Sequence, residues 1–253
     1  MEFKPIHAPS STDLFVDQLK AAILTGKYRP GDKLPSERQL EKQLCVSRAV
    51  INAGLKRLQD LHFITIRPRY GTFIADYRTE GDLTTMNEII NFHGGHYRIP
   101  LLKSIYRVRL QLEDDVIRLA ARAGDPTSLQ AASHALAALA NMTTPQAQAE
   151  RYFAFIHALA VASQNDVYPL LINNFRPLYL TLGKWTFEVV NLEEMVAANQ
   201  HLLALIRDGA AKAAVTANRQ LVKDSYRQLT GMDYLEPLAA VPAPGIGAGE
   251  RVQ

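Results

Sequence analysis

The chain has 253 residues, of which 47% are hydrophobic and 21% charged, and a net charge of +3. This length allows one large domain or two small ones, and the composition is that of a globular protein with a buried core. The sequence contains no run of about 18 apolar residues, so it predicts no membrane span. Residues 1–10 do not resemble a secretory signal. The single cysteine, Cys45, excludes an internal disulfide framework and a multi-cysteine metal site.

The charge is distributed unevenly along the chain. Residues 1–78 contain 13 Lys and Arg against 8 Asp and Glu, whereas the remaining residues contain 15 against 17. A basic first part with net charge +5, followed by a mildly acidic part with −2, indicates two domains, the first of which meets a polyanion. An excess of five charges can arise by chance, so the pattern of predicted elements must carry the argument.

The basic part begins with three short predicted helices after a tail over residues 1–11. Apolar residues recur at helical spacing in each, and the second and third are separated by about three residues. Two short helices joined by so tight a turn are typical of a helix-turn-helix. The predicted N-caps are Thr12 or Asp13, Ser36 and Ser47, and the helices end near Gly26, Val46 and Leu61.

Two β-rich segments, 63–66 and 72–75, come next, and they flank the basic sequence Arg67-Pro68-Arg69-Tyr70-Gly71. They predict a two-stranded hairpin, or wing, with a basic tip. Residues 1–77 are therefore predicted to be a winged helix-turn-helix domain.

The rest of the chain is predicted to be helical. Residues 78–100 form a predicted linker that contains His93-Gly94-Gly95-His96, in which a short helix near Leu83–Phe92 is possible and the two histidines are expected to be solvated. Residues 101–236 form a predicted all-helical bundle, and the Pro- and Gly-rich residues 237–253 a disordered tail. The predicted helices run from Leu101 to Gly124 and over about 127–141, 145–164, 166–186, 192–208 and 210–231.

The third helix presents side chains suited to reading base edges in a major groove. Arg48 can donate two hydrogen bonds to guanine, and Asn52 can pair with adenine. Ser47, as N-cap, brings the helix N-terminus near a phosphate. Arg38, at the start of the second helix, can contact the backbone or a groove edge.

Arg67 and Arg69 on the wing can enter the neighbouring minor groove, where the negative potential is focused. Each of these arginines alone would more often be a solvated charge. Together, on a helix-turn-helix with a wing, they predict binding to a double-stranded DNA operator.

Residues 12–77 resemble the winged-helix head of the GntR family of bacterial transcription regulators. One departure is that the family usually has Arg followed by Glu where this chain has Asn52 and Ala53, so its operator is expected to differ from the common half-site. The resemblance is carried by Gly26–Leu40, Val46–Arg48, Leu55–Leu58 and Gly71–Ile74.

The length and the absence of predicted strands after the wing favour the all-helical effector domain of the FadR subfamily. Arg107–Glu113 and Phe155–Asn165 resemble segments of that domain. The resemblance implies a mostly α chain that binds an effector and dimerises. We therefore expect a homodimer reading a short pseudo-palindrome.

Most domains of this type hold a divalent metal with one Asp and three His. The corresponding positions here are Phe153, His157, Asn199 and Leu221, and His201 lies two residues out of register. Phe and Leu cannot bind a cation, so no metal and no cofactor are expected. A single gap in the helix register, of two residues, would restore His201 but not the Asp.

A metal-free domain resembles the acyl-CoA-responsive branch, and Ala162–Tyr168 and Leu178–Phe187 support this, although Leu229 stands where that branch has Trp. Candidate cations for a ligand are Arg109, Lys184, Arg219 and Lys223. The predicted effector-binding residues are Arg109, His157, Tyr179 and Lys184. The alternatives are that His157 is a satisfied core histidine, that Tyr179 only packs, and that Arg109 pairs with Glu113, four residues on.

The sequence thus predicts a cytoplasmic regulator that binds DNA and senses an organic effector, with a fatty acid or acyl-CoA as candidate, and has no membrane partner. One alternative is a metal-assisted sensor of a small carboxylate. Another is an enzyme or metabolite-binding protein that carries a winged helix. Against enzyme activity, no nucleophile with a base and no Gly-rich phosphate loop occurs, and Asp114 and Asp115 face different sides of a helix.

Overall fold

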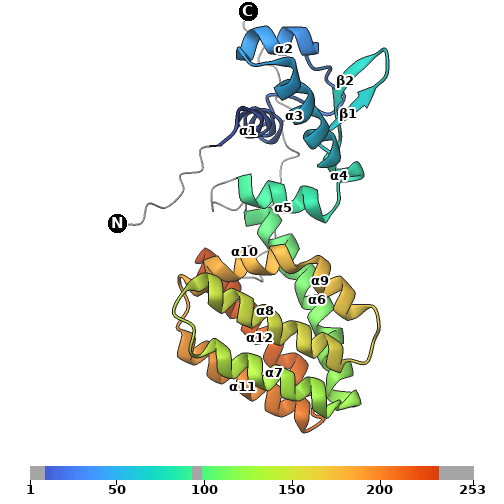
Figure 1. Cartoon of the computed structure of the whole chain (residues 1–253). Coiled ribbons are helices and arrows are strands. Elements are labelled where there is room, and N and C mark those ends of the chain that lie inside the picture. Colours follow the sequence, from blue (N-terminus) through green and yellow to red (C-terminus); the bar gives the residue numbers. More distant parts are fainter. Residues whose placement is uncertain (1–8, 93–98, 234–253) are drawn as a thin grey trace, which may run out of the picture. The chain divides into compact units, whose positions relative to one another are not determined.

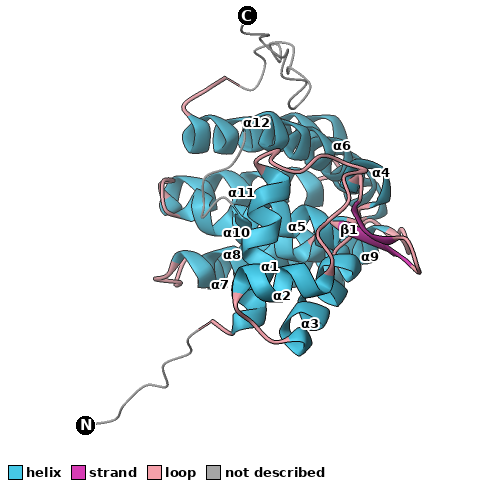
Figure 2. Cartoon of the chain, turned by 90° about the horizontal axis from the view of Figure 1, so that it is seen from above, coloured by secondary structure: helices cyan, strands magenta, loops and turns pink. Residues whose placement is uncertain are grey.

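The structure is a computed structural model that describes residues 9–92 and 99–233. These residues form two compact units, the head (9–92) and the helical unit (99–233), and helices dominate both (Figures 1 and 2). The elements of the head are α1 (Ser11–Leu24), α2 (Glu37–Leu44), α3 (Arg48–Asp60), β1 (Ile64–Arg67), β2 (Gly71–Ile74), α4 (Tyr77–Glu80) and α5 (Leu83–Phe92).

The helix N-caps of the head follow from local side-chain chemistry. Ser36 and Ser47 cap α2 and α3, as the sequence predicts. The prediction for α1 was wrong, because Ser10 is its N-cap and Asp13 is the third helical residue. The Ser10 hydroxyl accepts from the Asp13 amide at 3.1 Å, and the Asp13 carboxylate accepts from the Ser10 amide at 3.1 Å, a reciprocal capping box. The predicted tail therefore ends earlier than residue 11, and its residues 1–8 lie outside the described part.

The core of the head forms where α1 packs against α3. Val16, Ile51 and Leu58 are fully buried there. The helices approach closely at Gly54, where an added Cβ atom would lie 2.3 Å from a ring carbon of Phe15. An ion pair of 2.6 Å between Arg57 and Asp13 adds to the contact at the surface.

The hairpin follows α3 and is antiparallel, with Ile64 opposite Ile74 and Arg67 opposite Gly71. Its tip reverses through two left-handed residues, Arg69 and Gly71 (φ +69° and +117°). An isolated β-bridge between Lys33 and Phe73 connects the segment before α2 to this two-stranded sheet.

Two helices lie in the segment that the sequence predicts as a linker, and α5 spans the residues anticipated for its short helix. The Thr85 hydroxyl donates to the Leu61 carbonyl at 3.0 Å, and Ile90 is buried. The buried Lys20 of α1 lies 2.5 Å from Glu88. Residues 77–92 therefore pack against the rest of the head. His93, His96 and the predicted tail over residues 237–253 lie outside the described residues.

The helical unit consists of seven helices in its described residues, with no strand among them. Its core lies between α6, α7, α8, α11 and α12, with α10 packed on α8. No helix in the described ranges is long and apolar enough to cross a membrane. The helices are α6 (Ile99–Ala123), α7 (Pro126–Leu139), α8 (Pro145–Ala162), α9 (Tyr168–Asn174), α10 (Arg176–Phe187), α11 (Leu192–Arg207) and α12 (Ala211–Thr230).

The single helix predicted over 166–186 is instead two helices, α9 and α10, which meet at Phe175. Pro177 explains the break, because a proline has no amide hydrogen for the i→i−4 bond and its ring clashes with the preceding turn. As the second residue of α10, Pro177 occupies a position where a helical amide has no partner.

The Gly54 contact predicts the effect of one added methyl group. We expect Gly54→Ala to destabilise the head by about 1–3 kcal/mol, because the methyl group overlaps the Phe15 ring. Native-state hydrogen exchange in α1 and α3 measures this change. Ala53→Ser, on the exposed side of α3, is the matched control. Phe15→Leu, combined with Gly54→Ala, should restore part of the lost stability. Equal protection in Gly54→Ala and in the control would contradict the packing described here.

Candidate functional site

The turn between α2 and α3 positions the first residues of α3 at the surface. Cys45 ends α2 in a left-handed conformation (φ +53°), and the Ser47 hydroxyl then accepts from the Val50 amide at 3.4 Å. The Arg48 side chain is 73% exposed, and its Nε lies 3.4 Å from a carboxylate oxygen of Glu37, which is 43% exposed. A pair this exposed is weak, so Arg48 can exchange Glu37 for another acceptor.

The outer face of α3 is polar, and its inner face is apolar. Arg48 and Asn52, four residues apart, are exposed on one face, whereas Ile51, Leu55 and Leu58 are buried in the core. The core contact with α1 therefore directs the polar face outward. This is the arrangement required of a helix that reads a major groove.

The hairpin carries the two remaining predicted arginines, both exposed. Arg67 lies with its Cζ 4.9 Å from the centre of the Phe73 ring, which orients its guanidinium by a cation–π contact. Arg69 lies at the tip, and beside it Tyr70 is 73% exposed. The sequence reasoning missed Tyr70, although an aromatic residue within a basic hairpin tip was a readable signal.

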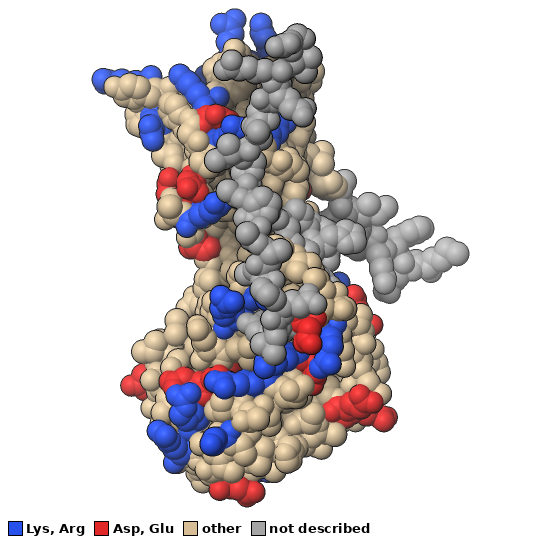
Figure 3. Space-filling model, turned by 180° about the vertical axis from the view of Figure 1, so that it is seen from behind, with Lys and Arg blue, Asp and Glu red and all other residues tan. Residues whose placement is uncertain are grey.

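All six residues predicted to bind DNA are exposed: Arg38, Ser47, Arg48, Asn52, Arg67 and Arg69. The side chains of Arg38, Asn52 and Arg69 form no hydrogen bond or ion pair with other described residues. Figure 3 shows many Lys and Arg side chains at the upper end of the head in that view, while both signs of charge mix on the helical unit.

The helical unit contains a buried cluster around Arg109, which we call the arginine cluster and define as Arg109, Glu113, Tyr152 and Tyr179. The Arg109 guanidinium donates to Glu113 at 2.7 Å and to the Tyr152 hydroxyl at 2.9 Å. The Tyr179 hydroxyl donates to the same Glu113 oxygen at 2.8 Å. The pairing of Arg109 with Glu113 that the sequence offered as an alternative is therefore present, and Tyr179 joins it.

Burial sets the protonation states in the arginine cluster. It raises the pKa of Tyr152 to about 12 and that of Tyr179 well above its ordinary value, with the Glu113 carboxylate adding to the effect on Tyr179. Burial alone would lower the pKa of Arg109, but Glu113 and the surrounding tyrosines raise it well above its ordinary value. Both hydroxyls thus stay protonated donors, and the guanidinium stays charged.

Several buried polar atoms of the same unit have no hydrogen-bond partner. They belong to α6, α11 and α12, and they are Glu113 Oε2, Asp114 Oδ1, Asn199 Oδ1 and Asn218 Nδ2. The other Asp114 oxygen accepts from Arg219 at 2.7 Å. Since buried polar atoms are normally paired, a water or a ligand group is the expected partner of these atoms.

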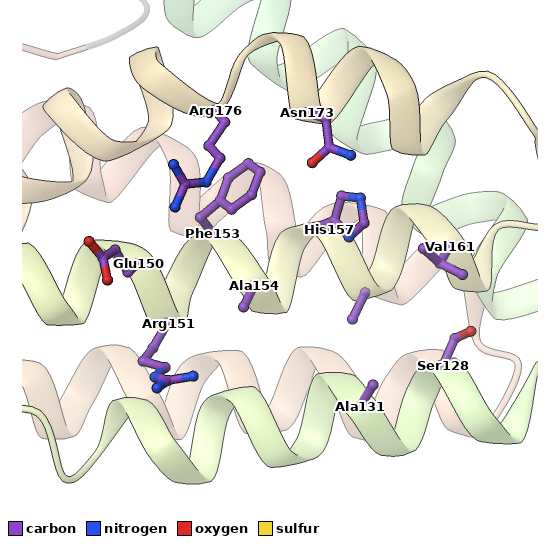
Figure 4. Close-up of a pocket in the computed structure, with 11 residues that line it drawn as sticks. Ser128, Ala131, Glu150, Arg151, Phe153, Ala154, His157, Val161, Asn173 and Arg176 are labelled. Carbon is purple, nitrogen blue, oxygen red and sulfur yellow. The ribbon is translucent and has the colours of Figure 1, made fainter.

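The other two predicted effector residues lie apart from Arg109. His157 lines a groove between α7, α8 and the junction of α9 with α10 (Figure 4), and its Nε2 is buried without a partner. Burial lowers its pKa. The Lys184 side chain is exposed on α10. The structure thus joins Arg109 and Tyr179 at Glu113 but brings neither His157 nor Lys184 to them.

The four positions that hold a metal in similar domains do not fit one here. Phe153 and Leu221 have no atom that could bind a metal ion, so only two of the four side chains, His157 and Asn199, offer one, the Asn199 Oδ1 being buried and unpaired. Within residues 9–92 and 99–233, no group of three or more His, Cys, Asp or Glu is placed to hold a metal ion.

Family models match both units: residues 14–74 match the model described as bacterial regulatory proteins, gntR family, and residues 104–224 match the FCD domain. The chain belongs to the GntR family of transcription regulators. Its helical unit is the FCD effector domain, and the chain falls in the FadR-like subfamily.

Similar proteins agree with this assignment. The regulator Mce2R of Mycobacterium tuberculosis is 28% identical over 71% of this chain and 74% of its own length. The fatty acid metabolism regulator protein of Proteus mirabilis is 25% identical over 79% of this chain and 82% of its own. A solved structure of Lar, which controls expression of the Listeria monocytogenes agr system, has a TM-score of 0.59 at 14% identity over 90% of this chain and 100% of its own; it supports the fold alone.

The arginine cluster predicts different costs for breaking and for replacing its ion pair. Arg109→Met leaves the Glu113 carboxylate buried without its cation, so we expect a loss of about 3–5 kcal/mol. In the double variant Arg109→Met/Glu113→Leu no charge remains buried, and much of the loss should be recovered. Urea unfolding followed by the fluorescence of Trp185, the only tryptophan of the chain, reports on the helical unit. A double variant less stable than Arg109→Met would contradict this account.

His157 predicts a pH dependence of stability. Because its pKa in the folded state lies below the usual 6.5, the unfolded chain binds a proton more readily below about pH 6.5, and the helical unit loses stability as the pH falls. In His157→Phe this contribution should disappear. The measurement is urea unfolding by Trp185 fluorescence from about pH 7.5 to about 5.5. The same pH dependence in variant and parent would refute the assignment.

Proposed function

We propose that two heads of a homodimer bind a pseudo-palindromic DNA operator, with α3 of each head in the major groove. Arg48 and Asn52 would contact base edges, and Ser47 would direct the helix N-terminus at a phosphate. Arg38 would contact the backbone, and Arg67 and Arg69 would enter the minor groove. The observation that carries this proposal is the exposed polar face of α3, since its opposite face is fixed in the core of the head.

Two substitutions separate base reading from backbone contact. Arg48→Ala should cost about 1–3 kcal/mol on an operator with the preferred base and little on one in which that base is changed. Arg38→Ala should weaken binding to both and reduce the salt slope by about 1, because a phosphate contact releases a counterion.

Operator titrations at several salt concentrations, read by fluorescence anisotropy, measure both effects. Arg122→Ala, an exposed arginine of the helical unit, is the control. If neither Arg48→Ala nor Arg38→Ala changes affinity, the proposed contacts are wrong.

For the effector we propose an organic anion with an apolar body, with a fatty acid or acyl-CoA as first candidate. Relatives named fatty acid metabolism regulator protein support this class at 24–28% identity. Three of the four unpaired buried atoms of α6, α11 and α12 are acceptors, so they would pair with hydrogen-bond donors of the ligand, such as hydroxyl or amide groups, and not with its anionic group. Such a ligand would act by binding one arrangement of the dimer more tightly than another. We propose that the chain acts in the cytoplasm and does no catalysis.

Native mass spectrometry of the protein purified from its own host tests the effector. A retained fatty acid or acyl-CoA, which releases operator DNA when added back, is the expected result. A retained small acid with a metal ion, or substrate turnover without operator binding, would overturn the proposal.

A further inference from the structure

The tip of the hairpin carries an aromatic side chain to which the proposed operator contacts assign no role. Tyr70 is 73% exposed, and its hydroxyl has no hydrogen-bond partner among the described residues. A single exposed aromatic side chain needs no explanation by itself. The surroundings of Tyr70 must therefore carry the argument.

The base of the hairpin is fixed to the segment before α2. The Leu34 amide donates to the Thr72 carbonyl at 2.8 Å, and the Ile74 amide donates to the Asp32 carbonyl at 2.9 Å. From this base the hairpin projects beyond the helices of the head (Figure 1). The backbone that leads to the tip is thus held in place by the fold of the head.

The tip itself is a turn of a defined kind. The Tyr70 amide donates to the Arg67 carbonyl at 3.0 Å, and the two residues between them are Pro68 and the left-handed Arg69, with φ +69°. A proline followed by a residue with positive φ is typical of a type II turn. This conformation is strained for arginine, whereas glycine adopts it freely. Since Arg69 and Tyr70 are both exposed, the turn presents a cation and a ring side by side.

The side chains next to Tyr70 are basic. The Lys33 side chain packs on the backbone of Gly71, where an added Cβ atom would lie 2.8 Å from Lys33 Cε. Lys33, Arg67 and Arg69 form no ion pair with any described residue. A polyanion that binds these cations would therefore meet the Tyr70 ring as well.

A DNA minor groove matches this combination of side chains. Its floor presents hydrogen-bond acceptors at A·T pairs, and at G·C pairs it also carries the guanine amino group. Cations are drawn to the groove most strongly where it is narrow, as over A·T runs. The ring of a tyrosine can lie between the sugars of the two strands while its hydroxyl donates to an acceptor on the floor. The guanine amino group would occupy that same space.

We propose that Tyr70 is a specificity-determining residue of the operator interface. Its ring enters the minor groove beside Arg69, and its hydroxyl donates to the N3 or O2 acceptor of an A·T pair. Tyr70 thereby selects A·T at one position of each half-site, outside the bases that α3 contacts. The inference rests on the operator binding proposed above, to which it adds a base position and the residue that reads it.

Base analogues that alter only the minor groove test this selection. A diaminopurine·T pair is an A·T pair with an added minor-groove amino group, and an inosine·C pair is a G·C pair without one; the major-groove edges stay the same. Diaminopurine is placed in turn at each A·T pair that flanks the centre of an operator selected from random DNA. We expect one position in each half-site at which the parent binds about tenfold more weakly, since a net hydrogen bond contributes roughly that factor. Inosine·C at that position should bind like A·T.

Substitutions at Tyr70 assign the discrimination to this side chain. Tyr70→Ser should bind A·T and diaminopurine·T at that position equally, and Tyr70→Phe should bind A·T more weakly than the parent but better than Tyr70→Ser. Leu14→Ser, which removes another exposed apolar side chain of the head, is the matched control and should discriminate like the parent.

Three results would overturn the role of Tyr70 while leaving operator binding intact. They are an operator without any position sensitive to diaminopurine, undiminished discrimination in Tyr70→Ser, and parent-like affinity of Tyr70→Phe. A parent that binds no operator would refute operator binding itself, and this inference with it.

The strained turn supplies an independent test of how Tyr70 is positioned. Because glycine keeps the left-handed conformation, Arg69→Gly should lower the salt slope by about 1 and retain the discrimination against diaminopurine. Valine is β-branched and disfavours positive φ, so Arg69→Val should lose the discrimination as well. Native-state hydrogen exchange in α1 and α3 checks that both variants are folded. Equal discrimination by the two variants would contradict the positioning of Tyr70 by this turn.

Discussion

The close contact between α1 and α3 is the constraint on which the proposed DNA-reading surface depends. Gly54 lets the Phe15 ring approach the α3 backbone to a distance that a side chain would block, and Ile51 and Leu58 fill the rest of the contact. Because these residues fix one side of α3, the opposite side with Arg48 and Asn52 faces solvent. The capping serine at 47 then sets where this face begins.

Two arginines of the head, Arg38 and Arg69, differ from two arginines of the helical unit, Arg109 and Arg219, in whether a carboxylate pairs with them. In the head, Arg38 and Arg69 are exposed and without a carboxylate partner among the described residues, which suits a surface that binds a polyanion. In the helical unit, Arg109 and Arg219 are neutralised by Glu113 and Asp114.

Local features of the sequence predicted much of the fold. The serines at 36 and 47 were readable as N-caps, and the family models and the helical structure confirm the winged helix-turn-helix followed by an all-helical effector domain. The cap of α1 was missed because Thr12 and Asp13 compete with Ser10 in the sequence, and only the reciprocal bonds of Ser10 and Asp13 decide among them. Pro177 is the local signal of the break between α9 and α10, which the predicted helix over 166–186 did not take into account. Tertiary packing, which periodicity does not encode, joins Tyr179 to Arg109 and turns His157 toward Asn173.

The central claim is that the exposed face of α3 reads bases, with Asn52 in place of the arginine usual in the family. In vitro selection of operators from random DNA, carried out with the parent and with Asn52→Arg, tests it most directly. The account predicts that both proteins select a pseudo-palindrome and that the variant changes the preferred base at one position of each half-site, from adenine toward guanine. Identical selected sequences for the two proteins would contradict it.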